Sequence, residues 1–414
     1  MESSHVKAAT SAESEPRRWS RRGVAACLFA GALTPVVSAT TGFTQLSTTS
    51  KGGNAMSDLS SYFAYVGART TKERGARGNG LNVYRVDAKT AVWTHVQLLD
   101  DLVNPSFLAF DRTRHFLYAV HGDLSDISAF AVDRTTGKLS SINRRSTGGK
   151  NPVHLAIDPT NRFVVVANHI TSTIALLPRE PDGSLGELVD LVKLEGKIGP
   201  HRVEQPFAKP HQTEFDPSGK YIVVPDKGLD RIFSFRLDGE NRKLIAVGKP
   251  AEAREGAGPR HIAFHPNGRL AYVINELDST VTAYHFDPAT GALEPFQLLS
   301  ALPDHFTGNS RASEIAISAD GRFLYASNRG YDSVVMFGVD QADGRLFANG
   351  WQISNGRTPR FFAIDPTGRF LFIANEESDT MVPCRIDPAS GKLTMAEGEL
   401  TVGSPVCIVF AAQS

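Results

Sequence analysis

Pro259-Arg-His-Ile-Ala-Phe264 is followed, after a short turn, by a second apolar run, Leu270-Ala-Tyr-Val-Ile274. The same register recurs along the chain: a proline (once an alanine), two variable residues, an apolar triplet, a turn and a further apolar run. The other copies of its first half are Pro105–Phe110, Pro152–Ile157, Pro210–Phe215, Ala312–Ile317, Pro359–Ile364 and Pro405–Phe410. Seven copies spaced 46 to 58 residues apart match the length of a propeller blade, so the sequence predicts a seven-bladed β-propeller.

Glycine turns between the copies support the same repeating unit. Glycine supplies the positive φ that tight hairpin turns require, and short runs rich in Val, Ile, Phe and Tyr flank each turn. The turns are Thr136–Leu139, Asp182–Leu185, Asp238–Glu240, Thr290–Leu293, Asp343–Leu346 and Ser390–Leu393. Strongly helical windows are missing. Each unit is therefore predicted to be a four-stranded antiparallel blade, and the fold class is all-β.

The two ends of the repeat region predict how the ring closes. The last copy, 405–410, supplies an inner strand and no others. Three strands at 62–66, 81–86 and 93–98 have no inner strand before them. We expect them to combine into one composite blade, because the pairing satisfies strand edges that would otherwise lie open.

The composition is that of an ordinary globular protein and excludes two classes of partner. Hydrophobic residues make up 41% of the 414 residues, and 44 basic residues balance 44 acidic ones. A chain without net charge lacks the positive field that nucleic acid or an anionic membrane requires, so neither is an expected partner. Cys27, Cys384 and Cys407 have no zinc-type spacing. No metal and no cofactor is expected, and Cys384 and Cys407 are predicted to be buried free thiols rather than a disulfide.

The first residues are predicted to be an export signal. Residues 1–39 contain the basic pair Arg21-Arg22, an apolar run and a small-residue end at Val37-Ser-Ala39, which resembles a twin-arginine signal. Residues 40–59 are predicted to be a flexible linker, and residues 60–414 the propeller domain. This interpretation places the protein in the periplasm or outside the cell, free of the membrane after cleavage. The alternative is a cytoplasmic protein whose translation starts at Met56.

One mouth of the channel is predicted to hold a ligand site. In an antiparallel hairpin, the start of the inner strand and the end of the second strand lie at the same end. Polar side chains gather at these positions, whereas the opposite ends carry repeated turn residues such as Asp216-Pro-Ser-Gly219. The strand starts include His154, His211, Arg260, His261, Glu314 and Arg360, and the strand ends include His121, Asn168, Lys227, Asn275, Glu276, Arg329 and Glu376. A charged face that varies between blades is typical of a binding site.

The segment Glu255–Arg269, followed by Ala271–Leu277, resembles the signature of the seven-bladed lactonase family. That family includes a bacterial type of 6-phosphogluconolactonase and the fungal carboxymuconate-lactonising enzyme, and the similarity covers residues 60–412. The resemblance implies an enzyme that opens or closes a lactone ring. The catalytic groups proposed for the family are a histidine, two arginines and a glutamate. By motif they correspond here to His211, Arg260, Arg329 and Glu276.

These residue types suit lactone hydrolysis. The reaction needs an activated water and cations that face the oxyanion formed at the carbonyl carbon. Glu276 or His211 is expected to act as general base, while arginine side chains bind the oxyanion and the anionic groups of the substrate. The residues expected to contact substrate are His121, His154, Asn168, Glu314, Arg360 and Glu376.

Each of these residues also has a purely structural interpretation. For Arg260 and Glu276 the alternative is an ion pair that braces two strands, and for His211 it is a channel side chain satisfied by its neighbours. For His121, His154, Arg360 and Glu376 the alternative is a rim hydrogen bond, and for Asn168 it is a role in bracing a loop. His261 is predicted to be a packing or surface residue.

Three functions fit the sequence. The first is hydrolysis of a sugar-acid lactone of the 6-phosphogluconolactone type, for which export favours an unphosphorylated substrate. The second is lactonisation of a muconate-like diacid, and the third is a non-catalytic propeller that binds a small molecule or a protein. The convergent Arg, Glu and His side chains favour an enzyme, acting as a monomer on a small molecule. The inserted segment Lys197–Phe207 is expected to carry His201 and Arg202 over the substrate.

Overall fold

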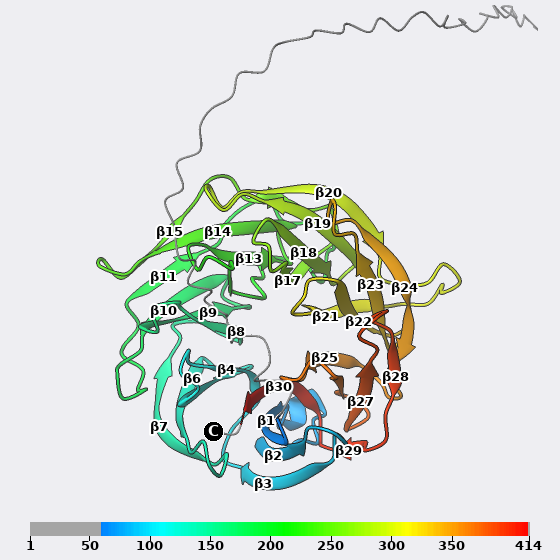
Figure 1. Cartoon of the computed structure of the whole chain (residues 1–414). Helices are drawn as coiled ribbons and strands as arrows, with labels where there is room; N and C mark the ends of the chain where they lie inside the picture. The colour runs from blue at the N-terminus through cyan, green and yellow to red at the C-terminus, as the bar shows by residue number, and fades with distance from the viewer. Residues whose placement is uncertain (1–58, 413–414) are drawn as a thin grey trace, which may run out of the picture. The chain divides into compact units, whose positions relative to one another are not determined.

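Seven antiparallel sheets are arranged around one axis in the computed structural model, which describes residues 59–412 (Figure 1). The prediction of an all-β, seven-bladed propeller is confirmed. Among the described residues, η1 (Lys72–Arg74) is the one helix, and none is long and apolar enough to cross a membrane. The predicted export signal, and the predicted linker apart from Leu59, lie outside the described residues.

In six blades the strands follow in chain order from the axis outward, and in the seventh the C-terminal strand, β30 (Pro405–Ala412), is innermost. The inner strands are β4 (Pro105–Phe110), β8 (Pro152–Ile157), β12 (Glu214–Phe215), β17 (Pro259–Phe264), β21 (Arg311–Ile317), β25 (Pro359–Ile364) and β30 (Pro405–Ala412). The second strands are β5 (Phe116–His121), β9 (Phe163–Asn168), β13 (Ile222–Asp226), β18 (Leu270–Asn275), β22 (Phe323–Arg329), β26 (Phe370–Asn375) and β1 (Ser61–Ala68).

The outer half of each blade contains the remaining strands. The third strands are β6 (Asp126–Val132), β10 (Thr173–Pro178), β14 (Arg231–Asp238), β19 (Thr280–Phe286), β23 (Ser333–Val339), β27 (Thr380–Ile386) and β2 (Leu81–Asp87). The outer strands are β7 (Leu139–Ser146), β11 (Asp190–Lys193), β15 (Lys243–Ala246), β20 (Leu293–Ser300), β24 (Leu346–Ile353), β28 (Leu393–Met395) and β3 (Trp93–Leu99). In two blades a short additional strand, β16 (Ala251–Glu252) or β29 (Leu400–Thr401), also pairs with the third strand.

The ring closes through a composite blade, as predicted. Its strand order is β3-β2-β1-β30, so the C-terminal strand is the inner strand of the blade that the N-terminal strands begin. β30 runs antiparallel to β1 from the pair Tyr62–Ala412 to the pair Ala68–Pro405. In Figure 1 the red β30 lies beside the blue β1. The seam between the chain ends is therefore held by main-chain hydrogen bonds.

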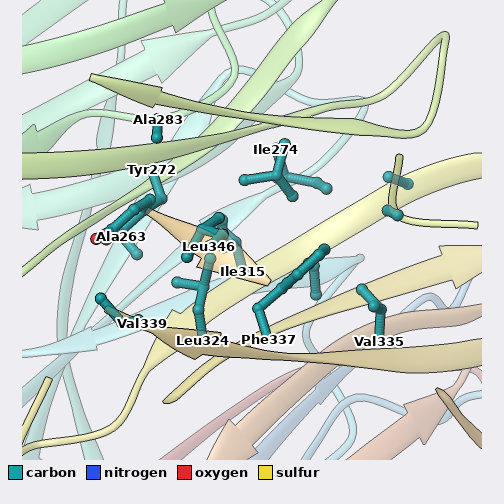
Figure 2. Packing of buried hydrophobic residues seen from close by; sticks show 14 of the residues in the cluster. Ala263, Tyr272, Ile274, Ala283, Ile315, Leu324, Val335, Phe337, Val339 and Leu346 are labelled. Carbon is teal, nitrogen blue, oxygen red and sulfur yellow. The ribbon is translucent and has the colours of Figure 1, made fainter. Parts of the chain in front are cut away.

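Hydrophobic side chains pack between neighbouring blades. Figure 2 shows one such layer, in which Tyr272 and Ile274 of β18 pack with Leu324 and Phe337 of the next blade. All four side chains are buried. Each sheet has two faces to cover, and repetition of this layer around the ring buries both of them.

A tyrosine on the second strand ties a blade to the glycine turn of the next blade. The Tyr272 hydroxyl donates a hydrogen bond of 2.9 Å to the carbonyl oxygen of Gly344. Equivalent bonds run from Tyr65 to Gly137, from Tyr118 to Gly183 and from Tyr325 to Gly391. Gly344 has a φ of +78°, and a Cβ atom there would lie 2.3 Å from the Leu270 side chain. The recurring glycine thus serves both the turn and the contact between blades.

A β-bulge at the start of the inner strand changes which side chains face the channel. In β17 the pairing register shifts between Pro259 and His261, and β4, β8 and β25 have the same shift at the same place. A bulge leaves one residue unpaired and re-aims its side chain. As a result, Arg260 and His261 both line one cavity in the channel, although successive side chains of a regular strand point to opposite faces.

Candidate active site

One repeat position places charged side chains around the channel mouth. It is the residue at or directly after the end of each second strand, where blade symmetry brings seven residues to the same height. The position is occupied by Arg69, Gly122, His169, Lys227, Glu276, Arg329 and Glu376. We call these residues the mouth ring.

Glu276 is the centre of a buried ion cluster. Its Oε1 atom accepts a hydrogen bond of 3.0 Å from Lys227 Nζ. Its Oε2 atom lies 3.3 Å from Arg260 Nε and 3.4 Å from an Arg329 terminal nitrogen. Arg260 and Glu276 belong to one blade, and Lys227 and Arg329 come from the blades on either side, so the cluster forms only when these three blades pack together. It brings together three of the four residues predicted to be catalytic.

The cluster keeps Glu276 ionised. Burial disfavours the carboxylate, but the charges of Lys227, Arg329 and Arg260 outweigh burial and hold the pKa of Glu276 well below its usual range. Burial, with the nearby charges of Arg360 and Arg329, lowers the pKa of Arg260 to about 9. At neutral pH the cluster therefore contains one anion and three cations. It carries an excess of positive charge that can attract an anionic or polarised substrate group.

His211, the fourth predicted catalytic residue, begins a line of buried hydrogen-bonding side chains. His211 Nδ1 lies 3.1 Å from His261 Nε2. His261 Nδ1 lies 3.0 Å from one Glu314 carboxylate oxygen and 3.1 Å from the other. Burial, together with the charge of Arg260, holds the pKa of both histidines well below the usual range, so both are neutral at pH 7. Burial raises the pKa of Glu314 to about 7.

Arginines of the ion cluster line a small cavity and a wider pocket. A cavity of about 10 Å³ lies in the channel, which is roughly the space that one water molecule needs. It is lined by Arg69, Ser106, Phe107, Val153, His211, Arg260, His261, Arg360, Phe361 and Val406. A wider pocket of about 470 Å³, here called the mouth pocket, is lined by His201, Leu277, Asn309, Ser310, Arg311 and Arg329. Arg260 lines the cavity and Arg329 lines the wider pocket. Glu276 contacts both of these arginines.

Arg360 and Glu376, two of the predicted binding residues, lie close together beside the cavity. Arg360 Nε is 3.8 Å from one carboxylate oxygen of Glu376, and Arg69 Nε is 3.9 Å from the other. Arg69 also lies 4.0 Å from the carboxylate of Asp123. These distances are longer than direct hydrogen bonds, so the guanidinium groups keep donors for another partner.

The other predicted binding residues lie away from the mouth pocket. Both ring nitrogens of His121 are engaged, with the Val103 carbonyl oxygen at 2.8 Å and Ser128 Oγ at 2.7 Å. The Asn168 amide bonds to the main chain and side chain of Thr147. His154 packs against Phe107 and borders a pocket at the opposite end of the channel. Glu314 lies within the channel, on His261.

The sequence of nearly the whole propeller matches that of a known protein family. Residues 63–410 match the model described as "Lactonase, 7-bladed beta-propeller". The chain belongs to this lactonase family. The match spans nearly the whole described propeller, and it therefore includes the ion cluster and the channel.

Named relatives are similar to this lactonase over almost the whole propeller. A 6-phosphogluconolactonase of Bacillus subtilis is 35% identical over 358 residues, which are 86% of this chain and 100% of the relative. The solved structure of the periplasmic gluconolactonase PpgL of Pseudomonas aeruginosa has a TM-score of 0.79 at 30% identity, covering 86% and 100% of the two chains. A putative 6-phosphogluconolactonase of Bacteroides fragilis has a TM-score of 0.78 at 30% identity, covering 85% and 98%.

Two members of the site were missed from the sequence. Arg69 was overlooked because its strand belongs to the composite blade, yet Tyr65-Val-Gly-Ala-Arg69 aligns with Tyr272-Val-Ile-Asn-Glu276. His261, predicted to be a packing or surface residue, is buried but lines the channel cavity. A signal for it was present, because His261 stands at the same motif position as Glu314.

The inserted segment does reach the mouth of the lactonase. His201 lines the mouth pocket, while Arg202 is exposed and does not. Glu204 lies 3.1 Å from Lys227 Nζ and 2.8 Å from an Arg311 terminal nitrogen. Gln205 anchors the segment through the Lys227 carbonyl oxygen at 2.8 Å. The segment therefore sets the charge at the edge of the pocket.

Proposed function

We propose that this lactonase hydrolyses a sugar-acid lactone at the channel mouth, with His211 as the general base and with Arg260 and Arg329 facing the oxyanion. One observation carries the proposal: a single buried carboxylate, Glu276, contacts both guanidinium groups beside a buried neutral histidine. Membership of the lactonase family and the names of the relatives support the same reaction class.

Glu276 is assigned the role of positioning the two arginines. A carboxylate stabilised by three cations is a weak base, which argues against the alternative that it activates water. Main-chain carbonyl oxygens also hold the guanidinium groups: Arg260 donates to Ser313 at 2.7 Å, and Arg329 donates to Ala312 at 2.9 Å. Donors fixed in this way stabilise a developing oxyanion without having to reorganise.

His211 is better suited to activate water. Its Nδ1 atom is engaged by His261, which leaves Nε2 as the nitrogen available to accept a proton. The neighbouring cavity, which His211 and Arg260 both line, has the volume of about one water molecule. A general base must be within hydrogen-bond reach of the proton that it removes, and a water molecule in this cavity would lie beside His211.

The substrate is assigned to the class of gluconolactones, and the site of action to the periplasm. A mouth pocket of about 470 Å³ is in the range of small-molecule sites. The twin-arginine-like sequence at residues 1–39 and the structural similarity to a periplasmic gluconolactonase support export. Export favours an unphosphorylated lactone over 6-phosphogluconolactone.

A pH-stat assay of the full chain tests this function. The panel is glucono-δ-lactone, 6-phosphogluconolactone and a muconolactone, each corrected for spontaneous hydrolysis. We expect acid release that falls by about 10²–10³-fold in Glu276→Gln, because the arginines lose the group that positions them. Glu255→Gln, which removes an exposed carboxylate paired with Lys197, is the matched control and should retain activity. Full activity in Glu276→Gln would refute the assigned roles, and no turnover of any lactone would refute the function.

A further inference from the structure

A line of three buried side chains, His211, His261 and Glu314, runs from the cavity into the channel. We propose that this line is a proton relay, in which Glu314 receives the proton that His211 removes from the attacking water and His261 conducts it between them. The inference rests on the proposed hydrolysis. His261 and Glu314 are positioning residues in it, because they act through His211 and do not touch substrate. We call these three residues the relay.

The surroundings explain why His211 needs a further acceptor. All three side chains of the relay are at most 6% exposed. An imidazolium ion at His211 would be buried next to the guanidinium of Arg260, and both burial and this like charge disfavour it. A proton that moves on to Glu314 instead neutralises a carboxylate and leaves both imidazole rings uncharged. The relay thus lets a buried histidine act as a base without becoming a buried cation.

The hydrogen-bond geometry has two matched patterns, one for each end state. With Glu314 ionised, His261 donates from Nδ1 to the carboxylate, and His211 donates from Nδ1 to His261 Nε2. The free electron pair is then on His211 Nε2. With Glu314 protonated, Glu314 donates to His261 Nδ1, His261 donates from Nε2 to His211 Nδ1, and the proton on His211 is on Nε2. The same three contacts of 3.0 to 3.1 Å serve both patterns.

The proton balance of the reaction closes on this relay. Water loses a proton to His211 Nε2 as its oxygen bonds to the lactone carbonyl carbon. The Nδ1 proton of His211 moves to His261 Nε2, and the Nδ1 proton of His261 moves to Glu314. When the ring C–O bond breaks, the proton returns along the same path to the leaving alkoxide. The product carboxylic acid then ionises in solvent, so the net reaction releases one proton and the relay is reset.

The charged and titratable groups that face the relay include three arginines. They are Arg260 and Arg360 near all three members, His169 near His211, Arg329, Glu276 and His154 near His261, and Glu214 and Cys407 near Glu314. The arginines favour an ionised Glu314 and burial favours a protonated one, and together they place the pKa of Glu314 at about 7. A carboxyl group with this pKa both accepts and returns a proton at neutral pH.

The relay predicts the sign of the pH dependence. Activity requires an ionised Glu314, so kcat should rise with pH through an acid limb near pH 7 and be lost below it. In Glu314→Gln the amide cannot store a proton. We expect kcat for glucono-δ-lactone to fall about 10²-fold with little change in KM, and the acid limb near pH 7 to disappear. Glu314→Asp should restore part of kcat and a displaced acid limb.

Glu214 provides a matched control for Glu314. It is a second carboxyl group in the channel with its pKa raised by burial to about 7, but its hydrogen bond is to Gln212 and it does not belong to the relay. Glu214→Gln should keep the wild-type kcat and an acid limb, moved at most to lower pH because one carboxyl group near Glu314 is removed. A second variant, His261→Gln, breaks the path at its middle. His261→Gln and Glu314→Gln combined should cost no more than either alone, because the relay acts as a unit.

The outcomes separate the relay from the proposed function. Turnover by the wild type with an unchanged acid limb in Glu314→Gln would overturn the relay and leave the hydrolysis standing. A lower kcat with the acid limb retained would show a structural role only, which also overturns it. If Glu314→Gln does not fold, infrared titration of the wild type must show a carboxyl group titrating near pH 7 that Glu214→Gln retains. Absence of lactone turnover by the wild type is the separate result that refutes the function.

Discussion

Arg69 shows how a single side chain of the mouth ring can be buried and still have donors to spare. It is 3% exposed, yet within residues 59–412 its Nε and one terminal nitrogen have no hydrogen-bond partner. Its two acidic neighbours, Asp123 and Glu376, lie at 4.0 and 3.9 Å. Buried donors are normally paired, so a buried guanidinium that borders a cavity in this way is suited to hold an anion.

We therefore expect Arg69→Lys to weaken substrate binding. Lysine keeps the charge but loses the planar fork that donates two parallel hydrogen bonds, here to hydroxyl or carbonyl oxygens of the neutral lactone. The loss of one charge-assisted bond should raise KM for glucono-δ-lactone roughly tenfold, with a smaller effect on kcat. Steady-state kinetics measure this, with Arg74→Lys as the control on an exposed neighbour that pairs with Asp123. An unchanged KM would mean that Arg69 serves the fold alone.

Sequence reasoning located the ion cluster but not the relay, for a physical reason. Arg260, Glu276 and Arg329 occupy repeat positions, and the blade repeat alone brings such positions to one height. The relay depends instead on side chains of three blades meeting at hydrogen-bond distance. No periodicity encodes that meeting, because it is decided by packing inside the channel.

At the scale of strands and turns, two features are relevant: the bulges within blades and the glycine turns between them. The bulges at the starts of inner strands were not predictable, since Pro-x-x reads the same with or without a shift of register. The glycine turns were predictable, but the reason for them was incomplete. Gly344 receives the Tyr272 hydroxyl and also packs against Leu270, so the turn belongs to the interface between two blades.

Two glycine substitutions separate backbone strain from packing at such turns. Gly344 and Gly368 both have positive φ, +78° and +68°, and either replacement by alanine should cost about 1–2 kcal/mol of backbone strain. A Cβ atom added at Gly344 would also contact the Leu270 side chain. A Cβ atom added at Gly368 would have no neighbour within 4 Å. We expect Gly344→Ala to lower the thermal midpoint of unfolding more than Gly368→Ala. Equal midpoints in scanning calorimetry would contradict a packing role for the turn.

At the scale of the whole molecule, the ring depends on its seam. Without β30, the edge of β1 and the apolar side chains that β30 covers would be open to solvent. Removal of residues 405–414 should therefore abolish a cooperative thermal transition and promote aggregation. Removal of residues 413–414 alone, which leaves β30 intact, is the control. A cooperative transition in the longer deletion would show that six blades and three strands are sufficient.

The reactivity of two buried cysteines can report whether the ring is closed. Cys384 and Cys407 are free, and burial raises the pKa of Cys384 to about 12 and that of Cys407 further. A buried thiol of high pKa is unreactive, so both should resist a thiol reagent in the native protein and react on unfolding. Cys407 lies on β30, opposite Gly67 of β1. Faster labelling of Cys407 than of Cys384 would report opening of the seam ahead of global unfolding.

The composite blade also sets the order in which the ring can close during synthesis. Translation proceeds from the N-terminus, so β1, β2 and β3 emerge first and wait unpaired on one edge while six further blade portions are made. Their inner strand, β30, is the last strand of the described residues to be synthesised. The residues of the ion cluster and of the relay all lie between His211 and Arg329, so they are made before it. Arg69, by contrast, meets Glu376 only after the chain has travelled round six further blades, and the ring closes when β30 pairs with β1.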